Sequence, residues 1–190
     1  MKRSLSSLLI IIPVLFLLFL LEKNNQPVAS MPTPSSVASC MPIATSSGSQ
    51  VLGVQTKRVG CVAINSLPDP ECTPGAVFPN VSKEDVCVSG YSSSVRSVSA
   101  KTKEIVYAEY GVDTHLPGEY EVDHLVSLEL GGSNEVSNLW PEIADPRPGY
   151  HEKDKVENLL HKKVCDGSIS LSEAQRIIAQ DWLSFYQANY

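Results

Sequence analysis

A Gly-Gly pair between two short apolar stretches constrains the fold of this chain most. In YEVDHLVSLELGGSNEVSNLW, apolar and polar residues alternate imperfectly up to Gly131-Gly132-Ser133-Asn134, a strong turn signal. We expect a strand followed by a loop over residues 120–130, and a brief second strand at Asn138-Leu139-Trp140. Pro141 should stop that strand, because proline has no backbone N–H. The sequence therefore predicts a β-hairpin here.

Helices are expected on both sides of the hairpin. Residues 99–111 fit a short helix ended by Gly111, and residues 150–164 fit a longer one. A last helix begins at Ser170-Leu171-Ser172-Glu173, which has capping-box spacing. Its apolar stripe, which we interpret as core, consists of Leu171, Ala174, Ile177, Ile178, Trp182 and Phe185. The predicted fold class is α+β, with the order strand, turn, strand, helix.

The first 30 residues are typical of an export segment, with Lys2 and Arg3 before an apolar run over residues 8–21. The run is shorter than the roughly 20 residues of a full membrane span. Two alternatives stay open: a signal peptide cleaved near residue 30, or a membrane anchor over residues 4–21. A lipoprotein box at residues 37–40 is weaker, because it does not adjoin the apolar run. The chain is expected to be exported, as a secreted, periplasmic or anchored protein.

The rest of the chain divides into two parts by composition. Residues 31–67 are rich in Ser, Pro and Thr and predict a flexible linker, with a short extended segment near residues 51–64. A compact domain is expected over residues 68–190. Export makes disulfides plausible among Cys40, Cys61, Cys72, Cys87 and Cys165, although an odd count leaves at least one unpaired or joined to another chain. No C-x-x-C pair is present, which argues against a cysteine-based zinc site.

Net charge limits how the chain could bind nucleic acid. The formal charge is −6, and loss of residues 1–30 removes three basic groups and one acidic group, which makes it −8. A net-acidic protein does not hold phosphate by its overall charge. If phosphate is the substrate, a bound cation must supply much of the attraction.

Four polar residues in and after the hairpin could carry chemistry: Asp123, His124, Asn138 and His151. Asp and neutral His can bind a divalent cation, and His can accept a proton near neutral pH. Consecutive strand residues point to opposite faces, so Asp123 and His124 can share one phosphate only where the strand ends or kinks. Each residue alone also has an ordinary explanation: Asn138 as a turn residue and His151 as a helix cap.

The segment YEVDHLVSLELGGSNEVSNLW, followed by HEKDKVENLLHKKVCDGSISLSEAQRIIAQDW, resembles the HNH nucleases, the ββα-metal or His-Me finger class. It is most similar to small exported bacterial HNH proteins, and the likeness extends upstream through CTPGAVF and VCVSGYSSSVR to cover about residues 68–185. The resemblance implies a ββα-metal finger with flanking helices.

The resemblance also implies roles for individual residues. His124 would be the general base that deprotonates water, and Asp123 and His151 would bind one divalent cation, Mg²⁺ first, with Mn²⁺ or Zn²⁺ as alternatives. Asn138 would hold the loop or the histidine, although Asn134 competes for that role. His161 lies about 15 Å along the same helix from His151, so both cannot bind one metal.

Candidate phosphate contacts are Arg96, Arg147, Lys153 and Lys155. Acidic residues interleave with the lysines, so a solvated helix face of mixed charge is an equal alternative. The implied function is a metal-dependent endonuclease that cuts DNA, with RNA as a further substrate, at low sequence specificity. The alternatives are an inactive exported or anchored binding protein that keeps the fold, and a zinc hydrolase acting on another substrate. The oligomeric state is not indicated.

Overall fold

The computed structural model describes residues 52–190, which form an α+β fold around a two-stranded antiparallel sheet. The elements in chain order are α1 (Lys83–Val86), α2 (Tyr91–Val95), α3 (Ala100–Glu109), β1 (Tyr120–His124), the 3₁₀ turns η1 (Leu128–Leu130) and η2 (Val136–Asn138), β2 (Leu139–Ile143), α4 (Tyr150–Cys165) and α5 (Leu171–Asn189). The predicted α+β class is confirmed. Among the helices of residues 52–190, none is long and apolar enough to cross a membrane.

Two glycines shape the connection between the strands. Gly131 has a φ of 77°, a left-handed conformation that side chains rarely adopt. At Gly132 a Cβ would lie 1.7 Å from the carbonyl oxygen of Val126, so only glycine fits there. The Gly-Gly pair is thus required by the close approach of the backbone, as well as by the turn.

Strand β2 continues past Pro141 to Ile143, so the prediction that this proline stops the strand is wrong. Pro141 lies opposite Val122. The Leu125 N–H donates to the Asn138 carbonyl, and bonded and non-bonded pairs alternate along an antiparallel ladder, so the Pro141 position is a non-bonded one. Its missing N–H would point away from β1, and no ladder bond is lost.

Sequence signals for the helix ends are confirmed. The Ser99 side chain accepts from the Thr102 N–H at the start of α3, and the Ser170 side chain accepts from the Glu173 N–H at the start of α5. Gly111 follows α3 with a φ of 67°. In α5 the backbone leaves helical geometry once, at Asp181.

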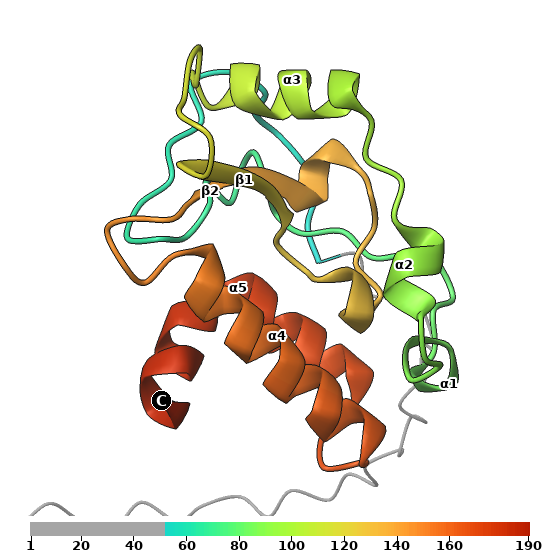
Figure 1. The fold of residues 1–190 in the computed structure, drawn as a ribbon. Coiled ribbons are helices and arrows are strands. Elements are labelled where there is room, and N and C mark those ends of the chain that lie inside the picture. Colours follow the sequence, from blue (N-terminus) through green and yellow to red (C-terminus); the bar gives the residue numbers. More distant parts are fainter. Residues whose placement is uncertain (1–51) are drawn as a thin grey trace, which may run out of the picture. The chain divides into compact units, whose positions relative to one another are not determined.

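The hairpin lies between α3 on one side and the paired helices α4 and α5 on the other (Figure 1). On the α3 side, Val122 and Leu139 pack with Val106 in a small apolar cluster. The larger core joins α4 and α5 to the loop after β1, and its buried members are Val86, Val126, Leu130, Val156, Leu160, Val164, Ala174, Ile178 and Trp182. The last three belong to the apolar stripe predicted for α5.

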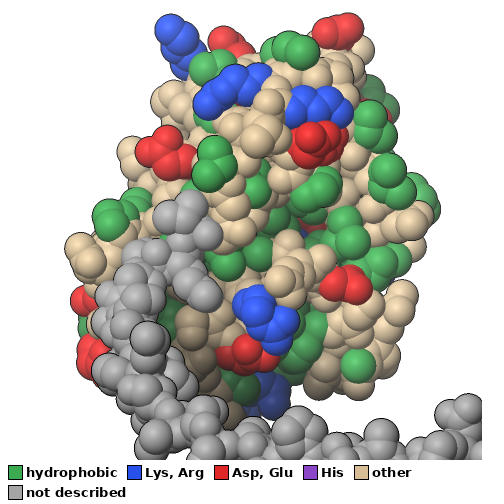
Figure 2. Space-filling model, turned by 180° about the vertical axis from the view of Figure 1, so that it is seen from behind, with side chains coloured by type: hydrophobic (Ala, Val, Ile, Leu, Met, Phe, Trp, Pro, Cys, Tyr) green, Lys and Arg blue, Asp and Glu red, His purple; other side chains and the backbone are tan. Residues whose placement is uncertain are grey.

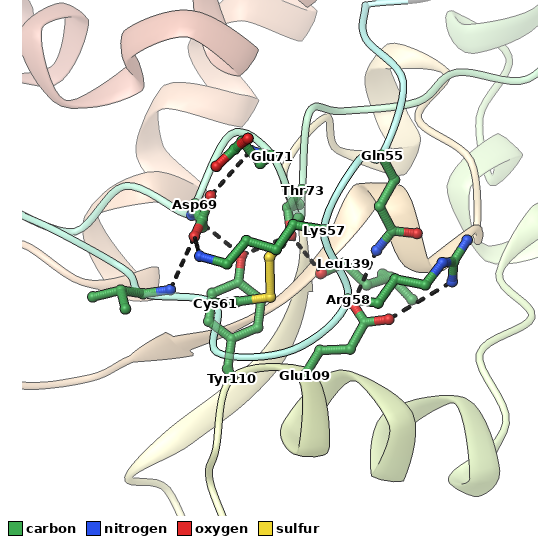
Figure 3. Close-up of a disulfide and its surroundings, with 12 residues drawn as sticks. Gln55, Lys57, Arg58, Cys61, Asp69, Glu71, Thr73, Glu109, Tyr110 and Leu139 are labelled. Atoms are coloured by element: carbon green, nitrogen blue, oxygen red, sulfur yellow. Dashed lines mark hydrogen bonds and ion pairs between the residues drawn. A yellow bond between two sulfur atoms is a disulfide. The ribbon is translucent and has the colours of Figure 1, made fainter.

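Residues 52–67 are tied to the domain, so the predicted boundary at residue 68 lies too late. Figure 3 shows the disulfide between Cys61 and Cys72, with Lys57 bonded to Asp69 at 2.8 Å beside it. Gln55 donates to the Glu109 carboxylate at 2.9 Å. The predicted signal or anchor over residues 1–30, and residues 31–51 of the predicted linker, lie outside the described residues.

A second disulfide joins Cys87, just after α1, to Cys165 at the end of α4. The expectation of disulfides is confirmed for four of the five cysteines, and Cys40 lies outside the described residues.

Candidate functional site

The adjacent residues Asp123 and His124 close strand β1 and belong to different surroundings. His124 is still paired with Leu139 of β2, so the strand keeps its alternation to its last residue. His124 therefore lies on the same face as Val122, toward α3, and Asp123 lies on the face toward α4. The kink that would bring both side chains to one phosphate is not seen in the strand pairing.

Asn134, in the turn after the glycine pair, holds the ring of His124. The Asn134 Oδ1 lies 3.2 Å from the His124 Nε2, and it also accepts from the Ser97 N–H at 3.1 Å. The Asn134 Nδ2 donates to the Val95 carbonyl at 2.8 Å. These two backbone partners fix which end of the amide carries oxygen, so the His124 Nε2 must be the protonated nitrogen. The Nδ1 atom is then left as the proton acceptor.

Burial keeps His124 neutral. The side chain is only 2% exposed, and this desolvation lowers the pKa of His124 below its ordinary value of 6.5. The neighbouring Asp123 carboxylate opposes the shift, and Arg96 and Lys153 add to it. At neutral pH the ring is therefore an uncharged base with a defined tautomer.

Asn138 holds the loop between the strands and does not contact the histidine through its hydrogen bonds. Its Oδ1 accepts from the Val126 N–H at 2.9 Å, and its Nδ2 donates to the carbonyls of Val126 and Ser133 at 3.0 and 2.9 Å. The side chain is fully buried. Of the two roles considered for Asn138, loop support is the one observed, and Asn134 contacts the histidine instead.

Asp123 is bound by the ammonium group of Lys153 from α4. The Lys153 Nζ lies 2.6 Å from the Asp123 Oδ2 and 2.7 Å from the His124 carbonyl oxygen, and it also contacts Glu157. Lys153 is 0% exposed. Burial alone would lower the pKa of Lys153, but the surrounding carboxylates raise it above its usual range. Lys153 is therefore a buried cation, which corrects its prediction as an exposed phosphate contact.

Two further carboxylates, Glu142 of β2 and Glu157 of α4, complete this buried cluster. Glu142 is fully buried, its Oε2 lies 4.0 Å from the Lys153 Nζ, and neither oxygen has a hydrogen-bond donor among residues 52–190. Burial raises the pKa of Glu142 well above its usual range and that of Glu157 to about 8. A protonated Glu142 avoids a second unpaired negative charge in the buried cluster beside Asp123.

The remaining predicted residues lie at the surface. His151 is exposed on the first turn of α4, with its ring 4.3 Å from that of Tyr150. Arg147 and Lys155 are each 3.7 Å from the Glu152 carboxylate, which supports the alternative of a mixed-charge helix face. Arg96 follows α2, is exposed, and lies close enough to His124 to influence its pKa.

Surface charge offers no single basic patch on the face seen in Figure 2, where basic and acidic side chains are interspersed. This agrees with the net negative charge of the chain. Nucleic acid bound on that face would gain little from overall electrostatics.

The predicted metal ligands do not assemble with a third ligand. Within residues 52–190, one set of three His, Cys or carboxylate ligand atoms lies within 4.8 Å of one another, and it consists of Cys87, His161 and Cys165. Asp123, by contrast, is neutralised by the Lys153 ammonium. The Asp123 carboxylate is thus already held by a cation of the protein, and the binding of a metal ion by Asp123 and His151 stays a prediction.

Comparison with known proteins adds no relative: no family model, curated protein or solved structure matches this chain.

Sequence reasoning missed the cluster of Lys153, Glu142 and Glu157. The spacing of four between Lys153 and Glu157 was a signal of an ion pair on one helix face. It gave no sign that the pair is buried against β1, because the apolar stripe of this helix is interrupted there.

Proposed function

We propose that this chain hydrolyses phosphodiester bonds of nucleic acid, as an exported enzyme of the HNH type, with His124 as the general base. The observation that carries the proposal is the hydrogen bond from the His124 Nε2 to Asn134, in a side chain whose pKa is lowered by burial. A neutral imidazole with a fixed tautomer suits proton abstraction near neutral pH. The strand, turn, strand, helix order around His124 agrees with the ββα finger.

The chemical step would use the free Nδ1 of His124. A water molecule gives its proton to this atom as its oxygen attacks phosphorus, the bond to the leaving oxygen breaks, and the departing oxygen takes up a proton from solvent water. The resulting imidazolium would be stabilised by Asn134 and by the nearby Asp123 charge. Arg96 is exposed, and its charge lowers the pKa of His124. It is our candidate contact for the substrate phosphate.

The HNH resemblance also implies a divalent cation. Such an ion, Mg²⁺ first, would stabilise charge on the phosphorane and the leaving oxygen. The Asp123 and His151 pair does not fit it in the described arrangement, because Lys153 occupies the Asp123 carboxylate. We therefore assign no step to a metal, and the need for one stays a prediction.

A plasmid-cleavage assay tests the proposal. The full chain is incubated with DNA and Mg²⁺ or Mn²⁺, with a chelator in a parallel reaction, and single-stranded RNA serves as a second substrate. His124→Ala should reduce the cleavage rate by about 100-fold or more, because a general base contributes that much. His115→Ala is the matched control, since His115 is exposed and lies outside this site.

Cleavage by His124→Ala at the rate of the unchanged protein would refute the proposal. Loss of cleavage in the chelator, with His124 intact, would establish that a divalent ion is needed.

A second candidate is an exported or anchored protein that binds nucleic acid without cutting it. The favouring observation is that His124 is only 2% exposed, so a substrate has little access to the ring. This candidate predicts the same nucleic-acid affinity with and without metal, and no cleavage under any of the conditions above.

A further inference from the structure

The far end of α4 carries a separate group of metal-binding side chains. Ligand atoms of Cys87, His161 and Cys165 lie within 4.8 Å of one another, and all three side chains are partly exposed. The cysteines are joined as a disulfide, and the His161 Nε2 lies 3.4 Å from the Cys165 sulfur. The group is built from a histidine and two sulfurs and shares no residue with the proposed catalytic site.

Helix geometry explains why this set is formed. His161 and Cys165 are four residues apart in α4, so their side chains lie on one face, one turn apart. Cys87 comes from the residue that ends α1, 78 positions earlier in the chain. A search for closely spaced cysteines in the sequence cannot find such a set, which is why a cysteine-based site was not expected.

The second nitrogen of His161 also has a suitable neighbour. The Nδ1 atom is 3.7 Å from the Glu129 carboxylate, while the Nε2 atom is 3.0 Å from the Val86 carbonyl oxygen. Because a carbonyl oxygen only accepts, the Nε2 carries the proton and donates to Val86 in the disulfide form. A carboxylate beside the far nitrogen is the usual support for a metal-binding imidazole, so Glu129 would favour the tautomer with the proton on Nδ1 once an ion takes the Nε2 position.

We propose that, when the Cys87–Cys165 disulfide is reduced, the two thiolates and His161 bind one zinc-like divalent ion. An external dithiol supplies the two electrons: the protein disulfide becomes two thiols, and the dithiol becomes a disulfide. The ion then displaces one proton from each thiol to solvent, the Nε2 of His161 gives its proton to solvent while Nδ1 takes one up beside Glu129, and the ion binds both sulfurs and the Nε2 atom. Three protein ligands leave a fourth position open to water.

In the reduced protein, the bound ion would link α1 to α4 in place of the Cys87–Cys165 disulfide. The other disulfide, Cys61–Cys72, provides the contrast, because it belongs to no three-ligand set among the described residues. Both disulfides give two thiols on reduction. Only the pair beside His161 is expected to bind the ion tightly, because thiolates and imidazole together suit zinc.

Cobalt titration of the full chain, kept in mild detergent because of its apolar first segment, tests the proposal. The reduced protein should bind one equivalent of Co²⁺, with a sulfur-to-cobalt charge-transfer band and the visible bands of tetrahedral cobalt, and zinc should displace it. The oxidised protein should show neither. His161→Gln should weaken binding by about tenfold or more, and Cys87→Ser should abolish the band.

The matched control is the double variant Cys61→Ser, Cys72→Ser, which also lacks two cysteines and should keep the band. Circular dichroism of each oxidised variant checks that it is folded. Absence of the band in the reduced unchanged protein, or an equal affinity in His161→Gln, overturns the proposal. The proposal would also be overturned if the Cys61→Ser, Cys72→Ser double variant lost the band while Cys87→Ser kept it. The ion would then be bound by Cys61 and Cys72. Zinc should raise the melting temperature of the reduced protein, and the rise at the same zinc concentration should be smaller in His161→Gln.

Discussion

The two faces of strand β1 differ in how they treat neighbouring polar residues. On the α3 side, His124 is neutral and is held by an amide, with no ion pair to any of residues 52–190. On the α4 side, Asp123 is charged and is held by a buried ammonium that it shares with two other carboxylates. One residue along the strand thus separates a proton acceptor from an ionic cluster.

The difference indicates that the two faces of β1 have different roles. A buried ion pair is costly to form and even more costly to break, so the Lys153 cluster is suited to fixing α4 against the hairpin. A buried neutral base loses less on desolvation and stays available for proton transfer. We therefore interpret the α4 face as support for the fold and the α3 face as the side on which His124 transfers protons. Substitutions on each face should therefore affect stability and cleavage rate differently.

Removal of the shared cation should have the largest effect. Lys153→Met leaves the ionised Asp123 buried without a counter-charge, and we expect the free energy of unfolding to fall by about 3–5 kcal/mol. Urea unfolding followed by tryptophan fluorescence measures this at pH 7. The loss should be smaller at pH 5, where the carboxylates can take up protons. A fall of under about 1 kcal/mol at pH 7 would show that the cluster is not structural.

Stability should fall as the pH rises from 6.5 to 8. Burial raises the pKa of Glu157 from 4.5 to about 8, so the folded protein binds more protons than the unfolded chain between these values. His124 has a lowered pKa and acts in the opposite sense, but only below pH 6.5. The expected fall is on the order of 1–2 kcal/mol. Unfolding curves across this range measure it, and Glu157→Gln should flatten the slope.

The histidine face should respond in rate and pH profile. Asn134→Ala removes the acceptor for the His124 Nε2–H, and we expect cleavage to slow by about two- to tenfold. Asn134→Asp keeps an acceptor oxygen but adds a negative charge, which raises the pKa of His124. The acidic limb of the rate profile, expected below pH 6.5 in the unchanged protein, should then move to higher pH. An unmoved limb would mean that Asn134 acts only on the fold.

The smallest effect is expected at Glu142. If this side chain is already protonated in the folded protein, Glu142→Gln replaces one neutral group by another of the same shape. The free energy of unfolding should change by less than about 1 kcal/mol, in contrast to Lys153→Met. A loss as large as that of Lys153→Met would show that Glu142 is ionised and required for charge balance.

Local sequence patterns predicted much of this fold correctly. The hairpin turn, the capped start of α5 and the end of α3 just before Gly111 all depend on neighbouring residues, so short segments of sequence are enough to predict them. The linker boundary and the effect of Pro141 were predicted wrongly. The first depends on a disulfide and the second on which side of the ladder the residue faces.

The candidate site was predicted in composition but not in arrangement. Asp123, His124 and Asn134 were all recognised as relevant, yet their partners come from segments that no local pattern connects. Asn134 is fixed by the backbone around α2, and Asp123 by a lysine 30 residues later. Lys153 on a charged helix segment has every local sign of a solvated residue, and its burial follows only from the packing of α4 on the hairpin.

By itself, then, the sequence determined the local elements and the pair of residues that ends β1, because capping, turn chemistry and strand alternation act over a few residues. The tertiary structure alone decided which residue neutralises Asp123, which amide orients His124, and that Cys87 meets His161 and Cys165. Each of these contacts closes a loop of ten or more residues. Their formation depends on how whole elements pack, and this packing is set by apolar residues from all parts of the core rather than by a short segment of sequence.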